Sequence, residues 1–314
     1  MAIVPQLGKL PHEGAEGHSN NDQARLRQDT IFCIQHDVNV TGKALWYIES
    51  HLSGEVSLEA IADAIDVSRF HLCRAFTVST GYSPAAYARA RRLTDAAKIL
   101  VQGAPDILGI ALTAGYGSHE AFTRAFRQLF GLTPEQLRAQ AHLDNLKLLE
   151  PIRMDQSTVT PLASPRVIES GALLIFGLGQ LYSCQANAAI PSQWDRFVPH
   201  LGHIQNQVGR VAYGVICNTD DAGNYEYICG VEVTEFPSHP AEFTRLRIGP
   251  QTYAVFDHRE HISTIATTWN SIWNQGLSDA GYQAADSPAL ERYGEEFDGR
   301  TGLGGVELWV PIKT

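Results

Sequence analysis

The sequence predicts two domains: an all-α domain with two helix-turn-helix units, then an α+β domain with duplicated strand-helix-strand-strand units around a groove. The 314 residues suit two domains of roughly 100–200 residues each. An internal repeat of 49–50 residues runs through the Ala-, Leu- and Arg-rich segment 41–140, where apolar residues recur at helical spacing. A second repeat, of 75 residues, runs through the segment from 166 onward, where β-branched and aromatic runs alternate with short helical patterns.

Composition and pattern divide the chain into four segments. Residues 1–40 have scattered Gly, Pro, His and Asn without a sustained period, and we expect a disordered or loosely attached extension there. We expect the first domain at 41–150, a polar, proline-punctuated linker at 151–165 and the second domain at 166–314. No segment approaches the roughly 18 apolar residues of a membrane helix, and no signal pattern opens the chain, so we expect a cytoplasmic protein.

The net charge of −10 is unevenly distributed. Residues 41–150 carry eleven basic and eleven acidic side chains, so this segment can still present a basic face to an anionic partner. The cysteines, at positions 33, 73, 184, 217 and 229, include no C-x-x-C pair, which favours buried reduced thiols over a zinc or redox site. We therefore expect neither a metal nor a cofactor.

The first unit of the shorter repeat predicts a helix-turn-helix. Ser57 can cap a helix whose apolar residues share one face at the spacing i, i+3, i+4 and i+7: Leu58, Ile61, Ala62 and Ile65. Asp66 marks the turn, because aspartate tolerates a left-handed backbone. Ser68 then caps a second helix, in which Arg69 and Arg74 are mixed with apolar residues.

The second unit repeats this pattern about fifty residues later. Gly115 supplies its turn, and Ser118 caps its second helix. Between the two units, Pro84 opens a long helix that runs to about Leu100. A rigid connecting helix would hold the two outer helices in successive major grooves of DNA, roughly 34 Å apart.

Three stretches closely resemble the DNA-binding domain of the AraC/XylS family, in its Rob/MarA-like branch. They are Ser-Arg-Phe-His-Leu-Cys-Arg-Ala-Phe at 68–76, Arg-Ala-Arg-Arg-Leu at 89–93, and the run 110–134 that ends Phe-Gly-Leu-Thr-Pro. The resemblance covers about 43–140 and implies a transcription regulator that binds double-stranded DNA, with RNA polymerase as a further candidate partner. It also implies that outward residues of the two recognition helices read bases. By position these are Arg69, Phe70, Cys73 and Arg74, then Ser118, His119, Glu120 and Arg124.

The arginines of this domain could have structural roles instead of DNA contacts. Arg74 and Arg124 recur in register, so each is either a DNA contact or a structural salt-bridge partner. On the connecting helix, Arg91 and Arg92 either contact phosphate or form a solvated face.

The chain also departs from the family pattern at some of these positions. That branch often has Trp where Phe70 stands and Gln where Cys73, His119 and Glu120 stand. Glutamine pairs with adenine, whereas a carboxylate accepts only from a donor such as cytosine N4. We therefore expect a different operator sequence.

The 75-residue repeat predicts two copies of a unit that reads strand, tryptophan-bearing helix, strand, strand. The expected pieces lie around 173–176, 194–201, 211–217 and 225–233, then around 252–257, 265–274, 289–293 and 306–312. Two copies related by a pseudo-twofold axis leave a groove between them. Aromatic residues with a few convergent polar groups are what a small-molecule pocket needs.

The second copy carries motifs that resemble the GyrI-like, or Rob-type, effector-binding domain. They include Tyr-Ala-Val-Phe-Asp-His at 253–258, Thr-Trp-Asn-Ser-Ile-Trp at 268–273 and Gly-Val-Glu-Leu-Trp-Val-Pro-Ile at 305–312. The resemblance covers about 166–314 and implies a pocket for hydrophobic, often cationic compounds, with a buried glutamate as counter-charge. We take Glu307 as this residue, with Trp309 on the same strand face and Tyr293 as a further pocket residue. Glu232, its repeat partner, would lie across the groove; each of these residues could instead be an ordinary strand or core residue.

Together these patterns favour a transcription regulator that responds to a small-molecule effector, and not an enzyme. The sequence contains no G-x-S-x-G motif, metal-ligand cluster or phosphate loop. Two alternatives stay open. One is a GyrI-like hydrolase of a small reactive compound that uses Glu307 with Tyr293. The other is a module in which the acidic C-terminal domain docks on a partner protein.

Overall fold

The computed structural model describes residues 39–54, 56–104, 106–152, 162–183 and 188–313. Most of the predicted N-terminal extension and linker, together with Cys33 and Cys184, lies outside these residues. The described residues from 39 onward form one compact unit. We refer to the described residues of 39–152 as the helical domain and to those of 162–313 as the sheet domain.

The helical domain contains the two expected helix-turn-helix units. Its helices are α2 (Val40–Ser50), α3 (Leu58–Ala64), α4 (Arg69–Thr80), α5 (Pro84–Val101), α6 (Ile107–Thr113), α7 (His119–Phe130) and α8 (Pro134–Gln140). Ser57, Ser68 and Ser118 cap α3, α4 and α7, each accepting a hydrogen bond from a backbone N–H three residues on. Asp66 and Gly115 have φ angles of 56° and 81°, so the predicted turn residues do adopt the left-handed backbone.

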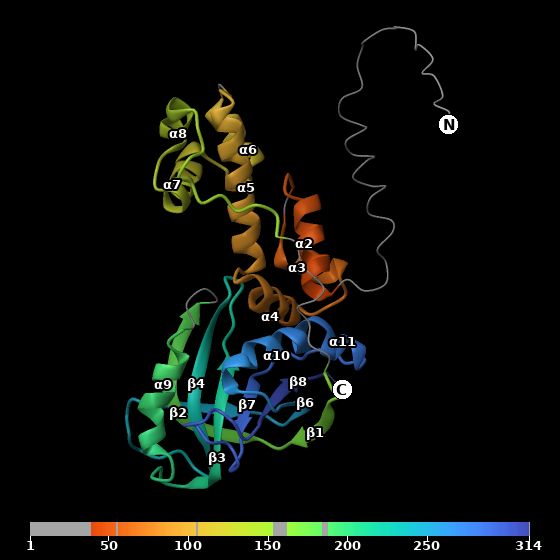
Figure 1. Ribbon diagram of the computed structural model, residues 1–314, viewed down its shortest axis with the longest axis vertical. Helices are drawn as coiled ribbons and strands as arrows, with labels where there is room; N and C mark the ends of the chain where they lie inside the picture. Colours follow the sequence, from red (N-terminus) through yellow and green to blue (C-terminus); the bar gives the residue numbers. More distant parts are fainter. Residues whose placement is uncertain (1–38, 55, 105, 153–161, 184–187, 314) are drawn as a thin grey trace, which may run out of the picture. The chain divides into compact units, whose positions relative to one another are not determined.

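Helix α5 connects the two units through their cores (Figure 1). In the first unit, Phe76 and Tyr87 pack edge to face at 5.6 Å between ring centroids, in a cluster that also holds Ile61 and Leu72. In the second unit, the other end of α5 packs with Phe122 and Phe126 and their neighbours. One continuous helix therefore fixes the spacing between the two predicted recognition helices, α4 and α7.

The sheet domain is built on a single eight-stranded sheet in which all the paired strands are antiparallel. The strands are β1 (Arg166–Ser170), β2 (Leu173–Ser183), β3 (Gln207–Cys217), β4 (Asn224–Val233), β5 (Thr244–Ile248), β6 (Gln251–His258), β7 (Ala289–Tyr293) and β8 (Val306–Pro311). The helical segments are α9 (Ile190–Phe197), η2 (Val198–His200), η3 (Ile262–Thr264), α10 (Ile265–Ser271), the π-helical turn η4 (Ile272–Gly276) and α11 (Leu277–Asp279).

The strand order β1-β6-β8-β7-β3-β4-β2-β5 reveals the predicted duplication. The copies are β2-α9-β3-β4 and β6-α10-β7-β8, and the second half of the order mirrors the first about the β7–β3 pair. The two edge strands, β1 and β5, were not predicted. They occupy equivalent ends of the mirrored order, and each directly precedes the first strand of one copy.

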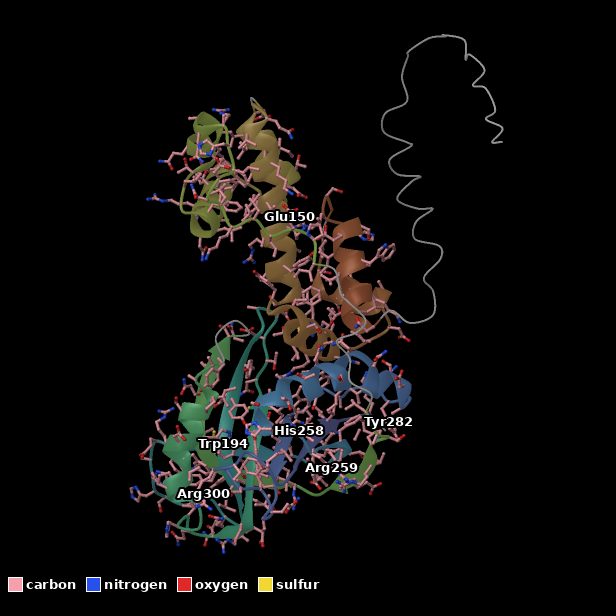
Figure 2. All side chains as sticks on the ribbon, in the orientation of Figure 1. Glu150, Trp194, His258, Arg259, Tyr282 and Arg300 are labelled. Carbon is pink, nitrogen blue, oxygen red and sulfur yellow. The ribbon has the colours of Figure 1, made fainter. Side chains whose placement is uncertain are left out.

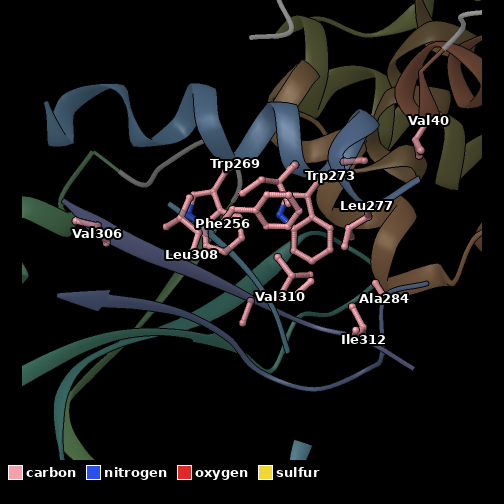
Figure 3. Close-up of a cluster of buried hydrophobic side chains, with 14 of the residues drawn as sticks. Val40, Phe256, Trp269, Trp273, Leu277, Ala284, Val306, Leu308, Val310 and Ile312 are labelled. Carbon is pink, nitrogen blue, oxygen red and sulfur yellow. The ribbon is translucent and has the colours of Figure 1, made fainter. Parts of the chain in front are cut away.

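The two faces of the sheet have different environments. Helices α9 and α10 cover one face, where Phe256, Leu308 and Val310 pack beneath Trp269 and Trp273 (Figure 3). The opposite face carries a separate apolar cluster that includes Tyr213, Tyr253 and Leu290, with Trp309 at its margin. In the described part of the chain, no helix combines the length and apolarity needed to cross a membrane.

Candidate functional site

Helix α7 presents an open polar surface. Glu120, Arg124 and Arg127 are exposed along it, and with His119, Thr123, Gln128 and Thr133 they line a hollow. His119 Nε2 lies 2.8 Å from Glu135 Oε1. The pKa of Glu120 is lowered by hydrogen bonds at the helix start, from its own backbone N–H and from the Ser118 hydroxyl. The four residues predicted on this helix therefore lie within its cap and first two turns, and three of them line the open hollow.

Helix α4 carries the other four predicted residues, and three of them are covered. Arg69 is exposed, but Cys73 and Arg74 are buried and Phe70 is half-buried. The Phe70 ring meets the Trp273 ring edge to face at 5.8 Å. The Arg74 guanidinium lies 5.2 Å from the centroid of Phe70 and 5.5 Å from that of Tyr225, a residue of β4. The sheet domain thus covers the face of α4 that corresponds to the open face of α7.

The arginines of the connecting helix bond within the helical domain. Arg91 Nε donates to Glu49 Oε1 at 2.8 Å, and its Nη1 donates to the Leu149 carbonyl at 3.0 Å. Arg92 Nε donates to the Leu52 carbonyl at 2.8 Å, and its Nη2 donates to the Gly54 carbonyl. Both side chains tie α5 to neighbouring segments, a role that the sequence did not suggest.

A buried carboxylate, Glu291, lies beneath α9 and α10 at the centre of the sheet domain. The residue is 6% exposed. The Tyr227 and Tyr293 hydroxyls donate to its Oε2 at 2.5 and 2.9 Å, and Trp269 Nε1 donates to its Oε1 at 2.9 Å. Both oxygens therefore accept from neutral aromatic donors.

Burial dominates the electrostatics of this carboxylate. Desolvation raises the pKa of Glu291, and the three hydrogen bonds and the nearby His258 ring only partly oppose that rise. His258 is itself buried and lies 2.8 Å, through Nδ1, from the Thr268 hydroxyl. Burial and the neighbouring Glu291 raise the pKa values of Tyr227 and Tyr293 well above their usual range, so both phenols keep their protons and donate.

Aromatic rings surround Glu291. Trp194 Nε1 donates to the Tyr227 hydroxyl at 3.1 Å, and the Trp194 ring meets the Tyr293 ring at 4.9 Å between centroids. Figure 2 labels Trp194 and His258 within the sheet domain. The paired strand β3 places Gly214 directly opposite Glu291, where an added Cβ would lie 2.7 Å from Glu291 Oε2 and closer still to the Tyr227 hydroxyl. A glycine is therefore required for this hydrogen bond to form.

Glu307, the carboxylate singled out from the sequence, has a different environment. Its side chain is 26% exposed, and it pairs with Arg166 at 2.8 Å and Arg292 at 3.2 Å. Trp309 Nε1 donates to it at 2.9 Å. Partial burial acts to raise the pKa of Glu307, but the bonds from Arg166 and Trp309 and the charge of Arg292 lower it overall.

The structure separates the predicted ligand residues into two groups. Arg292, the partner of Glu307, precedes Tyr293 in β7, and strand alternation places them on opposite faces of the sheet. Glu307 and Trp309 therefore do not meet Tyr293, which bonds to Glu291 instead. Glu232, half-buried on β4, is close enough to Tyr213 to act on its pKa, as is Glu307. The sequence signal for Glu291 was its place two residues before Tyr293, on the same face of one strand.

No group of three or more His, Cys, Asp or Glu side chains is placed to hold a metal ion in the described ranges. Cys73, Cys217 and Cys229 are buried free thiols. Burial raises the pKa of both Cys73 and Cys217 to about 12, so neither is an activated thiolate in this state.

Comparison with known proteins matches both domains. A helix-turn-helix domain family matches residues 61–140, and the family of GyrI-like small molecule binding domains matches residues 163–313. The transcriptional regulator Rob of Salmonella typhimurium is 37% identical over 140 residues, 45% of this chain and 47% of that protein. The multiple antibiotic resistance protein MarA of Escherichia coli is 31% identical over 106 residues, 34% of this chain and 84% of that protein.

An integron cassette protein of Vibrio cholerae aligns structurally with 48% of this chain and 97% of its own, at 16% identity and a TM-score of 0.37. The chain spans about half the length of Rob and of the other curated relatives that it matches over a similar number of residues. The matched families are a DNA-binding type and a small-molecule-binding type, and no enzyme family is indicated. The chain belongs to the AraC/XylS family of transcription regulators and carries a GyrI-like domain after its helix-turn-helix domain.

Proposed function

We propose that this chain is a sequence-specific DNA-binding transcription regulator whose activity is modulated by a small hydrophobic cation bound at Glu291. The observation that supports a cationic ligand is the buried Glu291 carboxylate, whose hydrogen-bond donors are all neutral. An ionised carboxylate is costly to bury without an opposite charge. A ligand that brings a positive charge would offset this cost.

The surrounding rings favour the same class of ligand. Trp194, Trp269, Tyr227 and Tyr293 all contact Glu291 or one another. A cation against an aromatic face gains about 0.5–2 kcal/mol per ring, in addition to its attraction to a carboxylate. Because Glu291 is closed off in this state, binding requires one or more of these side chains to move aside.

Glu307 is a weaker choice for the same role. It is already paired with two arginines, so a cationic ligand would have to displace Arg166 or Arg292 before it gained the carboxylate. We therefore assign the counter-charge to Glu291, and assign Glu307 to tying β1 to β8 across the intervening strand β6.

For DNA, the open face of α7 supports base or phosphate contact by Ser118, His119, Glu120 and Arg124. On α4, Arg69 is exposed as well. Its neighbours Phe70, Cys73 and Arg74 would reach DNA only after the sheet domain moves away from that helix. Arg91 and Arg92 could bind phosphate only by giving up bonds inside the helical domain. RNA polymerase stays a predicted partner.

The ligand proposal is tested with two ions of the same shape and opposite charge, tetraphenylphosphonium and tetraphenylborate. Calorimetry on the full chain should detect the cation and not the anion. Glu291→Gln, which removes the charge and keeps the volume, should weaken cation binding by tenfold or more, about 1.4 kcal/mol. Glu307→Gln is the matched control and should leave it unchanged. Equal binding of both ions, or no effect of Glu291→Gln, would refute the site.

A further inference from the structure

Helix α4, which carries four of the predicted DNA-reading residues, is bonded to the GyrI-like domain through other residues of the helix. His71 Nε2–H donates to the Trp273 carbonyl oxygen at 2.5 Å, and the Ser79 hydroxyl donates to Asn270 Oδ1 at 2.6 Å. Asn274 Nδ2 in turn donates to Ser79 Oγ at 2.8 Å. These bonds join one side of α4 to α10 and η4.

The start of α2 belongs to the same contact. The Thr41 backbone N–H donates to Asn274 Oδ1 at 3.0 Å, and Val40 packs in the apolar cluster that holds Trp269 and Trp273 (Figure 3). The contact therefore combines buried apolar area with specific hydrogen bonds from two helices.

Arg74 is poorly satisfied in this contact. It is 8% exposed, and neither its Nε nor its Nη2 has a hydrogen-bond partner within the part of the chain that the structure describes. A buried guanidinium with unpaired N–H groups is unfavourable, and the two ring faces only partly compensate it. DNA offers phosphate oxygens and guanine edges that would accept from these same atoms.

We propose that the GyrI-like domain holds α4 in a docked state that cannot enter a major groove, so that α7 alone is free to read DNA until α4 is released. A major groove about 12 Å wide admits one helix, and Phe70, Cys73 and Arg74 cannot reach base edges while a second domain covers them. Release would let one chain bind two successive grooves.

The docked helix is linked to the proposed ligand site through Trp269, and this step rests on the proposed function. Trp269 donates to Glu291 and stacks on Trp273 at 5.9 Å between ring centroids, with 14° between the ring planes. Trp273 in turn accepts the bond from His71. A cation that replaces the Trp269 N–H at Glu291 displaces α10 and η4, the elements that hold α4. The ligand shifts the equilibrium by its differential affinity for the docked and released states.

The buried thiol of Cys73 supplies a readout that does not depend on DNA. Cys73 is buried next to Arg74, whose guanidinium lies 5.5 Å from the ring centroid of Tyr225 in the sheet domain. Release of α4 exposes Cys73. Cys229, in the core between α9 and the sheet, stays buried and serves as the internal control.

The experiment compares the full-length wild type with Asn274→Ala, which removes bonds to Thr41 and Ser79 without altering α4 or Glu291. Alkylation of Cys73 by iodoacetamide is followed by peptide mass spectrometry. Footprints of each protein are measured on a DNA site that the same protein has selected from random oligonucleotides. We expect Asn274→Ala to alkylate Cys73 at least tenfold faster than the wild type and to extend the footprint by about one helical turn, about 10 bp. Tetraphenylphosphonium should likewise speed the alkylation of Cys73 and lengthen the footprint of the wild type.

The outcomes separate the two proposals. If Cys73 reacts at the same rate in both proteins and their footprints are equal, the docked state is refuted. If Asn274→Ala releases α4 but the cation leaves the wild type unchanged, docking is upheld and the link from Glu291 to α4 is refuted. The ligand site itself is then decided by the calorimetry with Glu291→Gln. Asn270→Ala repeats the test from a second position. In each variant, slow alkylation of Cys229 shows that a change at Cys73 does not come from unfolding of the sheet domain.

Discussion

Replacing Tyr227 by phenylalanine isolates the shortest bond to Glu291. The ring stays in place, but the 2.5 Å bond to Glu291 and the acceptor for Trp194 Nε1 are both lost. A hydrogen bond to a charged group contributes about 1.5–3 kcal/mol and a neutral one about 0.5–1.5 kcal/mol. We therefore expect Tyr227→Phe to lower the free energy of unfolding by about 2–4.5 kcal/mol where Glu291 is ionised.

Tyr182→Phe is the matched control. Tyr182 is also buried in the sheet domain, but its hydroxyl donates at 2.8 Å to a neutral acceptor, Gln193 Oε1. Its loss should cost only about 0.5–1.5 kcal/mol. Urea unfolding followed by tryptophan fluorescence suits the comparison, because Trp194, Trp269, Trp273 and Trp309 all lie in the sheet domain and Trp46 alone lies in the helical domain.

The pH dependence gives the sharper test. Burial raises the pKa of Glu291, so the stability that this group contributes is present at low pH and is lost as pH rises through its folded pKa. The Tyr227 bond favours the ionised form and lowers that pKa, so it opposes the loss. Tyr227→Phe should therefore cost more at about pH 8 than at about pH 5, whereas Tyr182→Phe should cost the same at both. Equal, pH-independent costs for the two variants would refute the assignment of Glu291 as a buried charge.

Three further predictions follow from the same geometry. Gly214→Ala should push Tyr227 from Glu291 and lower the free energy of unfolding in urea by about 1–3 kcal/mol. The control Gly171→Ala, whose added Cβ meets no atom within 4 Å, should leave the free energy of unfolding unchanged. Arg124→Ala should weaken specific DNA binding by about 1–3 kcal/mol in fluorescence anisotropy with unfolding unchanged. Arg91→Ala should instead lower stability by about 3 kcal/mol, because it leaves Glu49 without its guanidinium partner, and a purely DNA-binding defect in this variant would contradict the internal role.

Local chemistry explains why much of the fold could be predicted. The caps at Ser57, Ser68 and Ser118 and the turn at Asp66 depend on hydrogen bonds and backbone strain within a few residues, so the sequence defined them directly. The 75-residue repeat likewise predicted two copies of one topology, which the strand order confirms.

The local sequence pattern could not show which of the two glutamates, Glu291 or Glu307, is the buried one. Glu291 and Glu307 lie on neighbouring strands, and alternation states only which residues share a face within one strand. The placement of α9 and α10 over one face decides which carboxylate loses water. Glu307 lies on the other face, where Arg166 of β1 reaches it, and β1 was not predicted.

The sequence by itself determined the two helix-turn-helix units, the duplicated sheet units and the family, because all of these follow from short-range patterns and their repetition. Only the tertiary structure decided which carboxylate is buried and which of the two predicted recognition helices is accessible. Arg74 and Arg124 occupy equivalent positions fifty residues apart, yet the first is buried and the second is exposed. The difference comes from a contact between segments some two hundred residues apart in the chain, Ser79 with Asn270 and His71 with Trp273, and no local pattern encodes such a contact.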